Sequence, residues 1–380
     1  MLAERFLLSS DVLAGGGPLR GLRVVELGGI GPGPHAAMLL ADLGADVIRV
    51  ERPSGGLQII PPGQRDWLLR GRRLVVADMK TDVGRGAMWG MLDRADVLIE
   101  GFRPGVAERL GIGPEAVRVR NPGLIYARMT GWGQDGPMAL LAGHDINYIA
   151  VTGALNAFRV QGSRPVPPLN MVGDFGGGST FLVLGVLAAL WEREKSGAGQ
   201  VVDASIVDGT SALLQAIWSL RAAGTWTDTP AANLLDTGTP FYDTYECADG
   251  KYVAVGALEP QFYAVLLAGL ALKSEDLPDQ YDKGGWSMLR QRFAQTFASR
   301  TRDQWAEHFA GSDACVTPVL SFAEAAKYPH LVERRTLVEI DGVVQAAPAP
   351  RFSRTVPAIP AAPATEPCAV SEVLREWVPR

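Results

Sequence analysis

Two short segments flanked by glycines carry the residues best suited to move a proton. The sequence GHDINY at residues 143–148 places His144 between a glycine and an aspartate, and GDFGGG at residues 173–178 places Asp174 among glycines. An imidazole and a carboxyl group can both gain and lose a proton near neutral pH when their surroundings adjust their pKa values. A base and an acid on separate loops therefore predict a site for general acid–base catalysis.

Each of these residues also has a purely structural interpretation. A histidine before a helix is often only a polar turn residue, and an aspartate among glycines is often a turn residue too. The three consecutive glycines at residues 176–178 cost conformational entropy on folding, so they favour a place where the backbone must move or admit a ligand. The other three histidines, His35, His308 and His330, are interpreted as structural.

The composition is that of a globular protein with no sign of a nucleic-acid or membrane partner. A chain of 380 residues exceeds one typical core, so two domains are expected. The net charge of −5 provides no positive field for nucleic acid or an anionic membrane. Glu4, Arg5 and Asp11 interrupt the N-terminal segment, so no signal peptide is expected. The apolar run at residues 180–191 is too short to span a bilayer and predicts a buried helix.

The cysteines indicate a reducing compartment. Cys247, Cys315 and Cys368 are odd in number and widely spaced, and they match no metal-ligand pattern. The sequence therefore predicts a cytoplasmic protein without a metal site.

Strands and helices alternate along the first third of the chain. Apolar strands are predicted at residues 22–27, 46–51, 73–78, 96–100 and 124–128, with helices at 34–44 and 81–95 among them. This rhythm predicts an α/β fold with a mostly parallel sheet and helices on both faces. Further helices are expected at residues 179–194 and 204–223.

A smaller α+β domain is predicted at residues 241–325. Strands at residues 244–247 and 252–255 flank an Asp249-Gly250 turn, which is typical of a hairpin. Helices are expected from about residues 259 and 302, and a closing helix at residues 370–377.

The first turn of the large domain resembles a dinucleotide-binding fingerprint. Residues 31–36 match GxGxxA between a strand and a helix, and Glu51 lies near the end of the next strand. However, Pro32 and Pro34 each remove a backbone N–H that a phosphate cradle would use. A tight turn is thus the favoured interpretation, with a nicotinamide-dependent enzyme or a silent nucleotide-binding protein as the alternative.

Several motifs together resemble the family III CoA-transferase superfamily, and within it the racemase branch that acts on α-methylacyl-CoA thioesters. Besides the His144 and Asp174 segments, the resemblance rests on residues 45–53, 97–106, 129–134, 233–236, 240–246 and 255–263. It covers nearly everything between residues 17 and 355. The resemblance implies a Rossmann-like, CoA-binding large domain built from both chain ends, a small domain and an interlocked homodimer. The implied division is 1–205 for the N-terminal part of the large domain, 206–240 for a helix and linker, and 241–325 for the small domain. Residues 326–380 would form a linker back to the large domain and the C-terminal part of that domain.

The resemblance also implies the site residues. His144, Asp174 and Glu259 stand at catalytic positions, with Glu259 acting beside the partner subunit's His144. The positions that imply contacts with CoA are Ile30, Arg52, Ala77, Asp78, Met79, Lys80, Gly101, Phe102, Arg103, Arg109, Gly143, Ile146, Asn147 and Tyr148.

The implied reaction is epimerisation of (2R)- and (2S)-2-methylacyl-CoA by α-proton transfer through an enolate. His144 and Asp174 would serve the two faces of the carbon, and the backbone amide of Asp145 would stabilise the enolate oxygen. CoA is part of the substrate, and no further cofactor is expected. The alternative is a family III CoA-transferase in which Asp174 is the nucleophile.

Two groups of side chains carry further expectations. Met171, Leu234, Leu235, Phe241 and Tyr242 are candidates for the floor beneath the acyl chain. The arginines around the second and third strands, by contrast, are expected to be solvated surface residues, with a place at the edge of the nucleotide as the alternative: Arg49, Arg70, Arg72 and Arg73.

Overall fold

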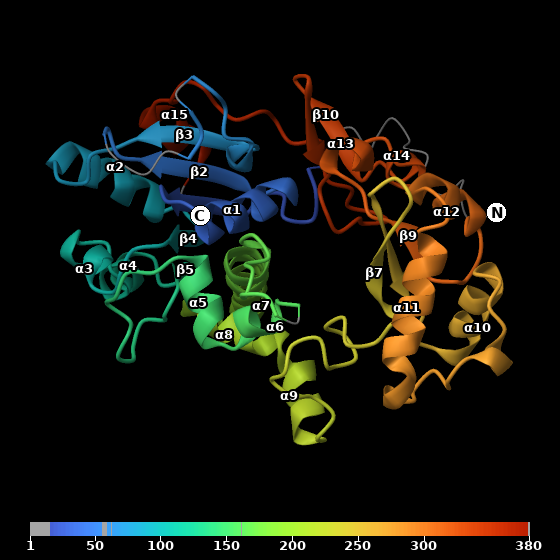
Figure 1. The fold of residues 1–380 in the computed structure, drawn as a ribbon. Coiled ribbons are helices and arrows are strands. Elements are labelled where there is room, and N and C mark those ends of the chain that lie inside the picture. The colour runs from blue at the N-terminus through green and yellow to red at the C-terminus, as the bar shows by residue number, and fades with distance from the viewer. Residues whose placement is uncertain (1–15, 55–58, 62, 161, 379–380) are drawn as a thin grey trace. The chain divides into compact units, whose positions relative to one another are not determined.

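The chain folds into two compact units that both contain segments distant in sequence (Figure 1). The computed structural model describes residues 16–54, 59–61, 63–160 and 162–378. The N-terminal charges that argue against a signal peptide lie outside the described residues. The first unit comprises the chain up to Thr152, residues 168–213, and the chain from Val332 onwards. The second comprises residues 153–167 and 214–331.

The first unit is built on a six-stranded parallel sheet in the order β3-β2-β1-β4-β5-β6. Its strands are β1 (Arg23–Leu27), β2 (Asp46–Glu51), β3 (Arg72–Val76), β4 (Val97–Glu100), β5 (Ile125–Thr130) and β6 (Val201–Ser205). The first five strands confirm the sequence-based assignments to within one or two residues. The direction of strand succession reverses between β1 and β4, and such a switch point forms a crevice at the carboxyl ends of the strands.

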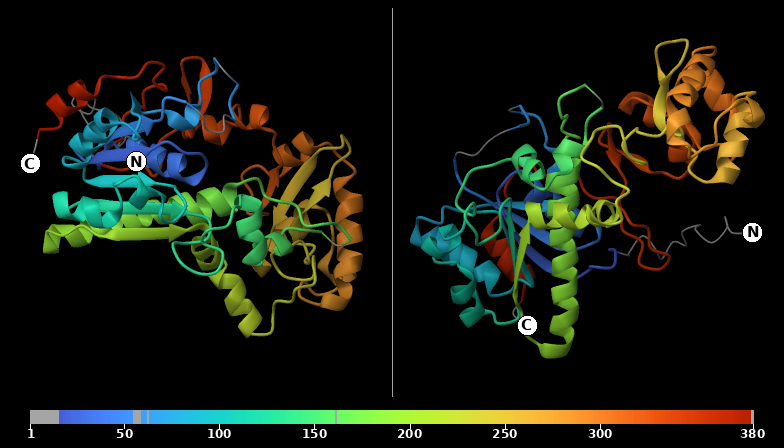
Figure 2. Two further views of the ribbon diagram at one scale, coloured as in Figure 1. Left: turned by 90° about the vertical axis from the view of Figure 1, so that its left-hand side faces the viewer. Right: turned by 60° about the horizontal axis from the view of Figure 1, so that its bottom comes forward.

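Helices bury both faces of this sheet, which explains why most residues of its strands are apolar. On one face, Val24 and Val97 lie in a core with α1 (Pro32–Asp42) and α7 (Phe181–Ser196). On the other, Val25 and Leu98 pack with α2 (Asp82–Leu92), α4 (Pro114–Arg120) and α15 (Val370–Glu376). The side chains of Val373 and Trp377 at the C-terminal helix thus complete the core of the first unit. The ribbon of this helix lies beside the sheet of that unit (Figure 2). The unit's remaining elements are α3 (Val106–Arg109), α5 (Asp145–Val151), α8 (Ile206–Leu213) and the hairpin of β10 (Leu337–Ile340) and β11 (Val343–Ala346).

The Asp174 segment forms a π-helix over Met171–Thr180 that runs directly into α7. Its glycines allow close packing against neighbouring helices. A Cβ at Gly177 would lie 2.5 Å from Thr210 Oγ1 of α8, and one at Gly178 would lie 3.0 Å from Pro32 Cβ of α1. The atoms nearest to these two glycines belong to neighbouring helices of the protein. We therefore assign the glycines to helix packing rather than to access for a ligand.

The joined helix at residues 171–196 is long and apolar enough to cross a membrane by length and composition alone. A core helix of a soluble protein meets the same criterion. Leu182, Val183 and Val186 are buried against the sheet, whereas Leu184 is 59% exposed and Trp191 is 68% exposed. The expectation of a buried helix therefore holds for one side of it only.

The sequence-based helix at residues 204–223 is wrong in its details. Residues 201–205 form strand β6, and the helical remainder is divided between α8 in the first unit and α9 (Gln215–Ala222) in the second. The strand runs straight into a helix without a turn residue, so no sequence signal separates the two.

The second unit packs helices over a three-stranded antiparallel sheet, β7-β8-β9. The predicted hairpin is confirmed, with Gly250 at a φ of 72° in its turn. A core around Phe241, Phe293 and Trp305 joins the sheet to the helices. The elements are α6 (Ala154–Ala157), β7 (Tyr242–Glu246), β8 (Tyr252–Gly256), α10 (Pro260–Gly269), α11 (Trp286–Phe297), α12 (Arg302–His308), β9 (Val316–Pro318) and α13 (Phe322–Ala325), with α14 (Pro329–Glu333) where the chain leaves the unit.

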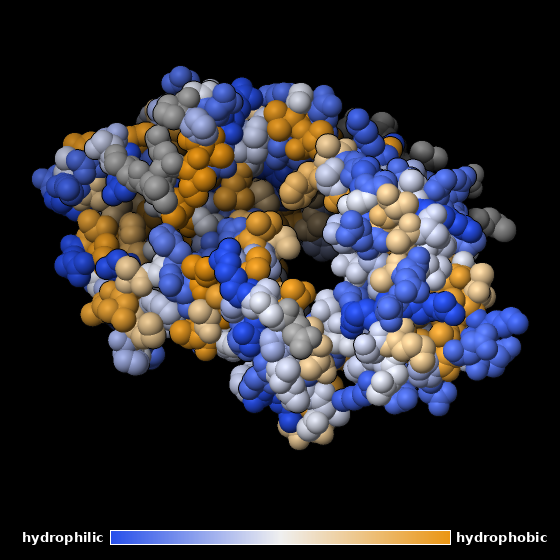
Figure 3. All heavy atoms as spheres, in the orientation of Figure 1, coloured by the Kyte–Doolittle hydropathy of each residue, from blue (hydrophilic) through white to orange (hydrophobic). Residues whose placement is uncertain are grey.

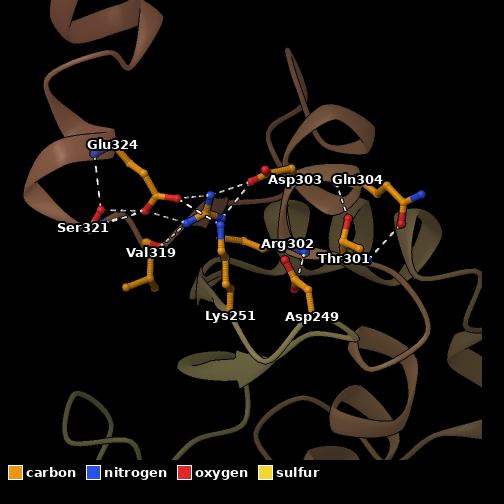
Figure 4. Close-up of polar contacts among 9 residues, drawn as sticks. All are labelled: Asp249, Lys251, Thr301, Arg302, Asp303, Gln304, Val319, Ser321 and Glu324. Carbon is orange, nitrogen blue, oxygen red and sulfur yellow. Dashed lines mark hydrogen bonds and ion pairs between the residues drawn. The ribbon is translucent and has the colours of Figure 1, made fainter.

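Arg302 joins the elements of the second unit through an ion pair with the partly exposed Glu324 (Figure 4). Its guanidinium donates to both carboxylate oxygens of Glu324 and to the carbonyl of Val319. The hydrogen bonds from Arg302 hold the pKa of Glu324 well below its ordinary value. This cluster therefore stabilises the unit, and none of its members belongs to the predicted site.

Candidate active site

The residues predicted to contact CoA in the first half of the chain lie at one edge of the parallel sheet. Ile30 follows β1, Arg52 follows β2, residues 77–80 follow β3 and residues 101–103 follow β4. Because the strands are parallel, their carboxyl ends share one edge, which is where α/β sheets bind ligands. The cationic side chains of this group are exposed, as expected for groups that bind phosphates: Arg52, Lys80, Arg103 and Arg109.

Buried ion pairs hold the loops at this edge. Arg49 of β2 forms a buried ion pair with Glu26 on the neighbouring strand β1. It also donates to the Gly29 carbonyl in the loop before Ile30. Glu100 accepts from the backbone N–H of Phe102 at 2.7 Å and from Arg128 Nε at 2.9 Å. Burial raises the pKa of Glu100, although these hydrogen bonds oppose the rise.

The expectation that the arginine cluster is solvated surface is wrong for three of its members. Arg49, Arg70 and Arg72 are only 6%, 2% and 6% exposed. Arg49 and Arg72 both pair with Glu26, and Arg70 pairs with Asp42. Because each guanidinium has a carboxylate partner, the charges can be buried.

α5 begins at Asp145, and His144 is its N-terminal cap residue. The Oδ1 atom of Asn147 accepts from the backbone N–H of His144 at 3.1 Å. Tyr148 is 9% exposed, and its hydroxyl donates to the Gly143 carbonyl. Asn147 and Tyr148 therefore shape the loop, while the His144 and Ile146 side chains are exposed.

Two glycines make room for the Tyr148 ring. A Cβ at Gly131 would lie 2.0 Å from the ring, and one at Gly143 would lie 2.7 Å from it. Trp132 contacts the same ring edge-to-face. The loop that carries His144 is thus fixed against the end of β5.

Asp174 is half-buried on the π-helix, close enough to His144 for the two to interact electrostatically. Desolvation by burial is the main cause that raises the pKa of Asp174 to about 6, with a smaller contribution in the same direction from Asp145. The hydrogen bond from Asn170 and the charge of His144 oppose this rise. A carboxyl group with a pKa near 6 can act as either acid or base at neutral pH.

Asp145 is connected to the Asp174 segment through its side chain. The backbone N–H of Asp174 donates to Asp145 Oδ1 at 2.7 Å. The Asp145 side chain is buried, and burial raises its pKa. The structure therefore gives the Asp145 carboxylate a contact that the sequence did not predict, since only its backbone amide had been assigned a role.

His35 supports the π-helix from α1. Its ring stacks on Phe175 with a centroid distance of 4.3 Å, and its Nδ1 lies 2.6 Å from Ser179 Oγ. Ser179 Oγ donates to the Phe175 carbonyl, so the Nδ1–H of His35 is the donor to Ser179. Burial and the nearby Arg72 and Arg70 lower the pKa of His35 to about 4, and the ring is neutral at neutral pH.

Glu259 lies in the second unit, as the exposed cap residue of α10. Because the two units are described separately, its relation to the His144 of either subunit stays a prediction. Among the acyl-floor candidates, Phe241 is wholly buried in the core of the second unit and cannot contact a substrate. Met171, Leu235 and Tyr242 remain exposed.

The chain matches CoA-transferase family III over residues 19–368. It is 47% identical over 364 residues to the alpha-methylacyl-CoA racemase of Mus musculus, across 94% of this chain and 93% of the relative. Identity to the alpha-methylacyl-CoA racemase of Homo sapiens is 45%, across 90% and 88% of the two chains. The crystal structure of a CAIB/BAIF family protein from Brucella suis superposes with a TM-score of 0.79 at 25% identity, across 96% of this chain and 100% of that one.

Proposed function

Because this chain belongs to CoA-transferase family III, we propose that it is an isomerase that interconverts (2R)- and (2S)-2-methylacyl-CoA thioesters. The observation that carries the proposal is the hydrogen bond between the two segments: the backbone N–H of Asp174 donates at 2.7 Å to Oδ1 of Asp145, the residue that follows His144. The high identity to two racemases over nearly the whole chain supports the same reaction.

The reaction moves one proton off and one proton onto the same carbon. One of His144 and Asp174 removes the α-proton, and the electron pair of the C–H bond forms the C=C bond of an enolate. The other residue then donates its proton to the opposite face, so the electron pair returns to a new C–H bond with inverted configuration. In the reverse direction the two residues exchange roles.

The enolate oxygen needs hydrogen-bond donors that are in place before the charge develops. The backbone N–H of Asp145 is the donor we propose, because the first residues of a helix have no intrahelical carbonyl partner for their N–H groups. The thioester carbonyl itself acidifies the α-carbon, and inversion changes no oxidation state. The reaction therefore requires no redox cofactor.

The phosphates of CoA would bind to the exposed cations at the carboxyl edge of the sheet. Arg52, Lys80 and Arg103 follow three different strands that share this edge. A chain of net charge −5 must concentrate its positive charge locally to bind a polyanion. Arg109 at the end of α3 extends the same group of cations.

The decisive test is incorporation of deuterium from D₂O into a 2-methylacyl-CoA. We expect either enantiomer to acquire one α-deuteron and to racemise, without added nicotinamide or free carboxylic acid. NMR follows the α-proton, and chiral chromatography of the hydrolysed acid follows configuration. Absence of exchange with a panel of branched and aryl-substituted thioesters would refute the proposal.

The same experiment separates the proposed reaction from CoA transfer. A transferase would form a thioester between Asp174 and CoA and would require a second carboxylic acid as acceptor. Trapping of that adduct by hydroxylamine, together with strict dependence on an acceptor acid, would support the transferase. The racemase predicts neither result.

We also propose that the chain forms an interlocked homodimer. The support is a set of large apolar side chains exposed on helices of both units, among them Leu184 and Trp191 on α7, Leu213 on α8 and Trp218 on α9. Apolar residues also interrupt the polar surface in the space-filling view (Figure 3). Leu184 and Trp191 are seven residues apart on α7 and therefore share one exposed helix face, which a second copy of the chain would cover.

Interlocked chains cannot separate without partial unfolding. We expect sedimentation at nanomolar concentration to give twice the chain mass of 40.6 kDa, with no monomer on further dilution. Dissociation should occur only in denaturant, in step with loss of helical circular dichroism. A folded monomer at low concentration would contradict the proposal.

A further inference from the structure

We propose that the carboxylate of Asp145 is a positioning residue that sets the distance between the two proton-transfer groups. This inference rests on the proposed function and adds a role for a side chain whose backbone amide alone was expected to act. Asp145 directly follows His144 in the sequence and is hydrogen-bonded to the backbone of Asp174. One side chain thus links the segments that carry the acid and the base.

The contact joins two helices at their first turns. Asp145 is the first residue of α5, and its Oδ1 atom accepts from the Asp174 N–H at 2.7 Å. Because the donor belongs to the π-helix, rotation or translation of that helix relative to His144 would break this bond. Inversion requires the acid and base to be held on opposite faces of one carbon, so such a displacement would slow the reaction.

Gly173 has no side chain, and the Asp145 carboxylate occupies the space that a side chain there would need. A Cβ at Gly173 would lie 2.2 Å from Asp145 Oδ1 and 2.8 Å from Ile149 Cγ2. No side chain larger than hydrogen fits while Asp145 keeps its place. The glycine of the GDFGGG segment therefore serves the Asp145 contact, whereas its three later glycines serve helix packing.

A contribution to folding stability alone does not explain why a carboxylate is present at Asp145. The side chain is buried, and its Oδ2 atom has no hydrogen-bond partner among the residues that the structure describes. An unpaired buried polar atom costs folding free energy. A residue that bears this cost, beside the proposed base and bonded to the segment of the proposed acid, is better explained by the geometry of the reaction.

The charge of Asp145 also affects Asp174. Its negative field contributes to the raised pKa of Asp174, whereas His144 acts in the opposite direction. The other polar and titratable groups near Asp174 are Asn170, the cap residue of the π-helix, and Tyr148 on α5. Gly31, the cap residue of α1, also faces the carboxylate. Removing the Asp145 charge should therefore lower the pKa of Asp174.

Two substitutions separate position from charge. Asp145→Ala removes the acceptor, and we expect kcat to fall by roughly 100-fold with KM for the thioester changed less than about threefold. Asp145→Asn keeps an acceptor oxygen and loses the charge, so its kcat should fall much less. Its acidic limb of kcat/KM should move to lower pH, by roughly half a unit. Glu115→Gln, which removes an 82% exposed carboxylate on α4, is the matched control and should leave both values unchanged.

A double-mutant cycle tests the contact itself. Gly173→Ala should resemble Asp145→Ala, because its methyl group displaces the carboxylate from Asp174. In the double variant the clash with Asp145 is gone, so the second substitution should add little to the first. Such a shortfall from additivity is the signature of a direct contact, and folding is checked by circular dichroism and thermal unfolding.

Three outcomes would overturn the inference while the wild-type enzyme stays active. They are an unchanged kcat in Asp145→Ala, fully multiplicative effects of the two substitutions, and an Asp145→Asn variant that loses as much activity as Asp145→Ala with an unshifted pH profile. If instead the wild-type protein catalyses no α-exchange, the proposed function itself has failed. The two failures are therefore distinguishable.

Discussion

His144→Ala should abolish racemisation yet leave α-deuterium exchange in one enantiomer. The substitution removes the acid–base group from one face of the carbon, and we expect the rate of inversion to fall by roughly 10²–10⁴-fold. Asp174 remains on the other face. It can still remove the α-proton of the enantiomer that presents this proton to it, and it can return a deuteron to the same face with retention of configuration.

Asp174→Ala should give the mirror-image result, with exchange confined to the other enantiomer. The measurement incubates each pure enantiomer in D₂O and follows both deuterium content and configuration. His330→Ala, which removes an exposed imidazole from the second unit, is the control and should behave as the parent protein. If both variants exchanged both enantiomers equally, two groups on opposite faces would no longer explain the chemistry.

The pH profile follows from the same pair. Both productive forms of the free enzyme hold one proton between His144 and Asp174, so kcat/KM should depend on pH identically in the two directions. Activity should fall as the pH drops below about 6, the pKa of Asp174, because the pair then holds two protons. The apparent value belongs to the pair rather than to either residue.

The strands and the two acid–base segments were predictable because local pattern determines them. Short apolar runs rich in β-branched residues, such as residues 97–99, favour buried strands in a sheet covered on both faces. Thr81 was predicted to begin a helix and does, since its hydroxyl accepts from the Gly84 N–H. β6 was missed because its end leads into α8 without a turn residue.

The electrostatic environment of the site was not predictable from local pattern. Arg49 and Arg72 resemble surface residues in sequence, yet both pair with Glu26, which lies more than twenty residues away along the chain. The contact between Asp145 and Asp174 likewise joins residues separated by 29 positions. Such pairs depend on which helices and strands become neighbours, and that information resides in the tertiary fold.

Gly177→Ala should be among the most destabilising single substitutions outside the acid–base pair. The added Cβ would lie 2.5 Å from Thr210 Oγ1, 2.6 Å from Thr210 N and 3.0 Å from Ile206 O. Two of these three atoms are backbone atoms, which cannot rotate away, so α8 and the π-helix must separate. We expect the free energy of unfolding to fall by roughly 3 kcal/mol or more. Activity should also fall, because Asp174 lies on the displaced helix.

Gly86→Ala is the matched control on α2, where an added Cβ meets nothing within 4 Å. It should raise stability by roughly 0.5–1 kcal/mol, since alanine favours a helix more than glycine does. Thermal and urea unfolding of both variants, with and without a CoA thioester, decide between the two explanations of the glycines. Helix packing predicts a lower unfolding midpoint for Gly177→Ala under both conditions. An unchanged midpoint combined with a raised KM would instead indicate that Gly177 makes room for the ligand.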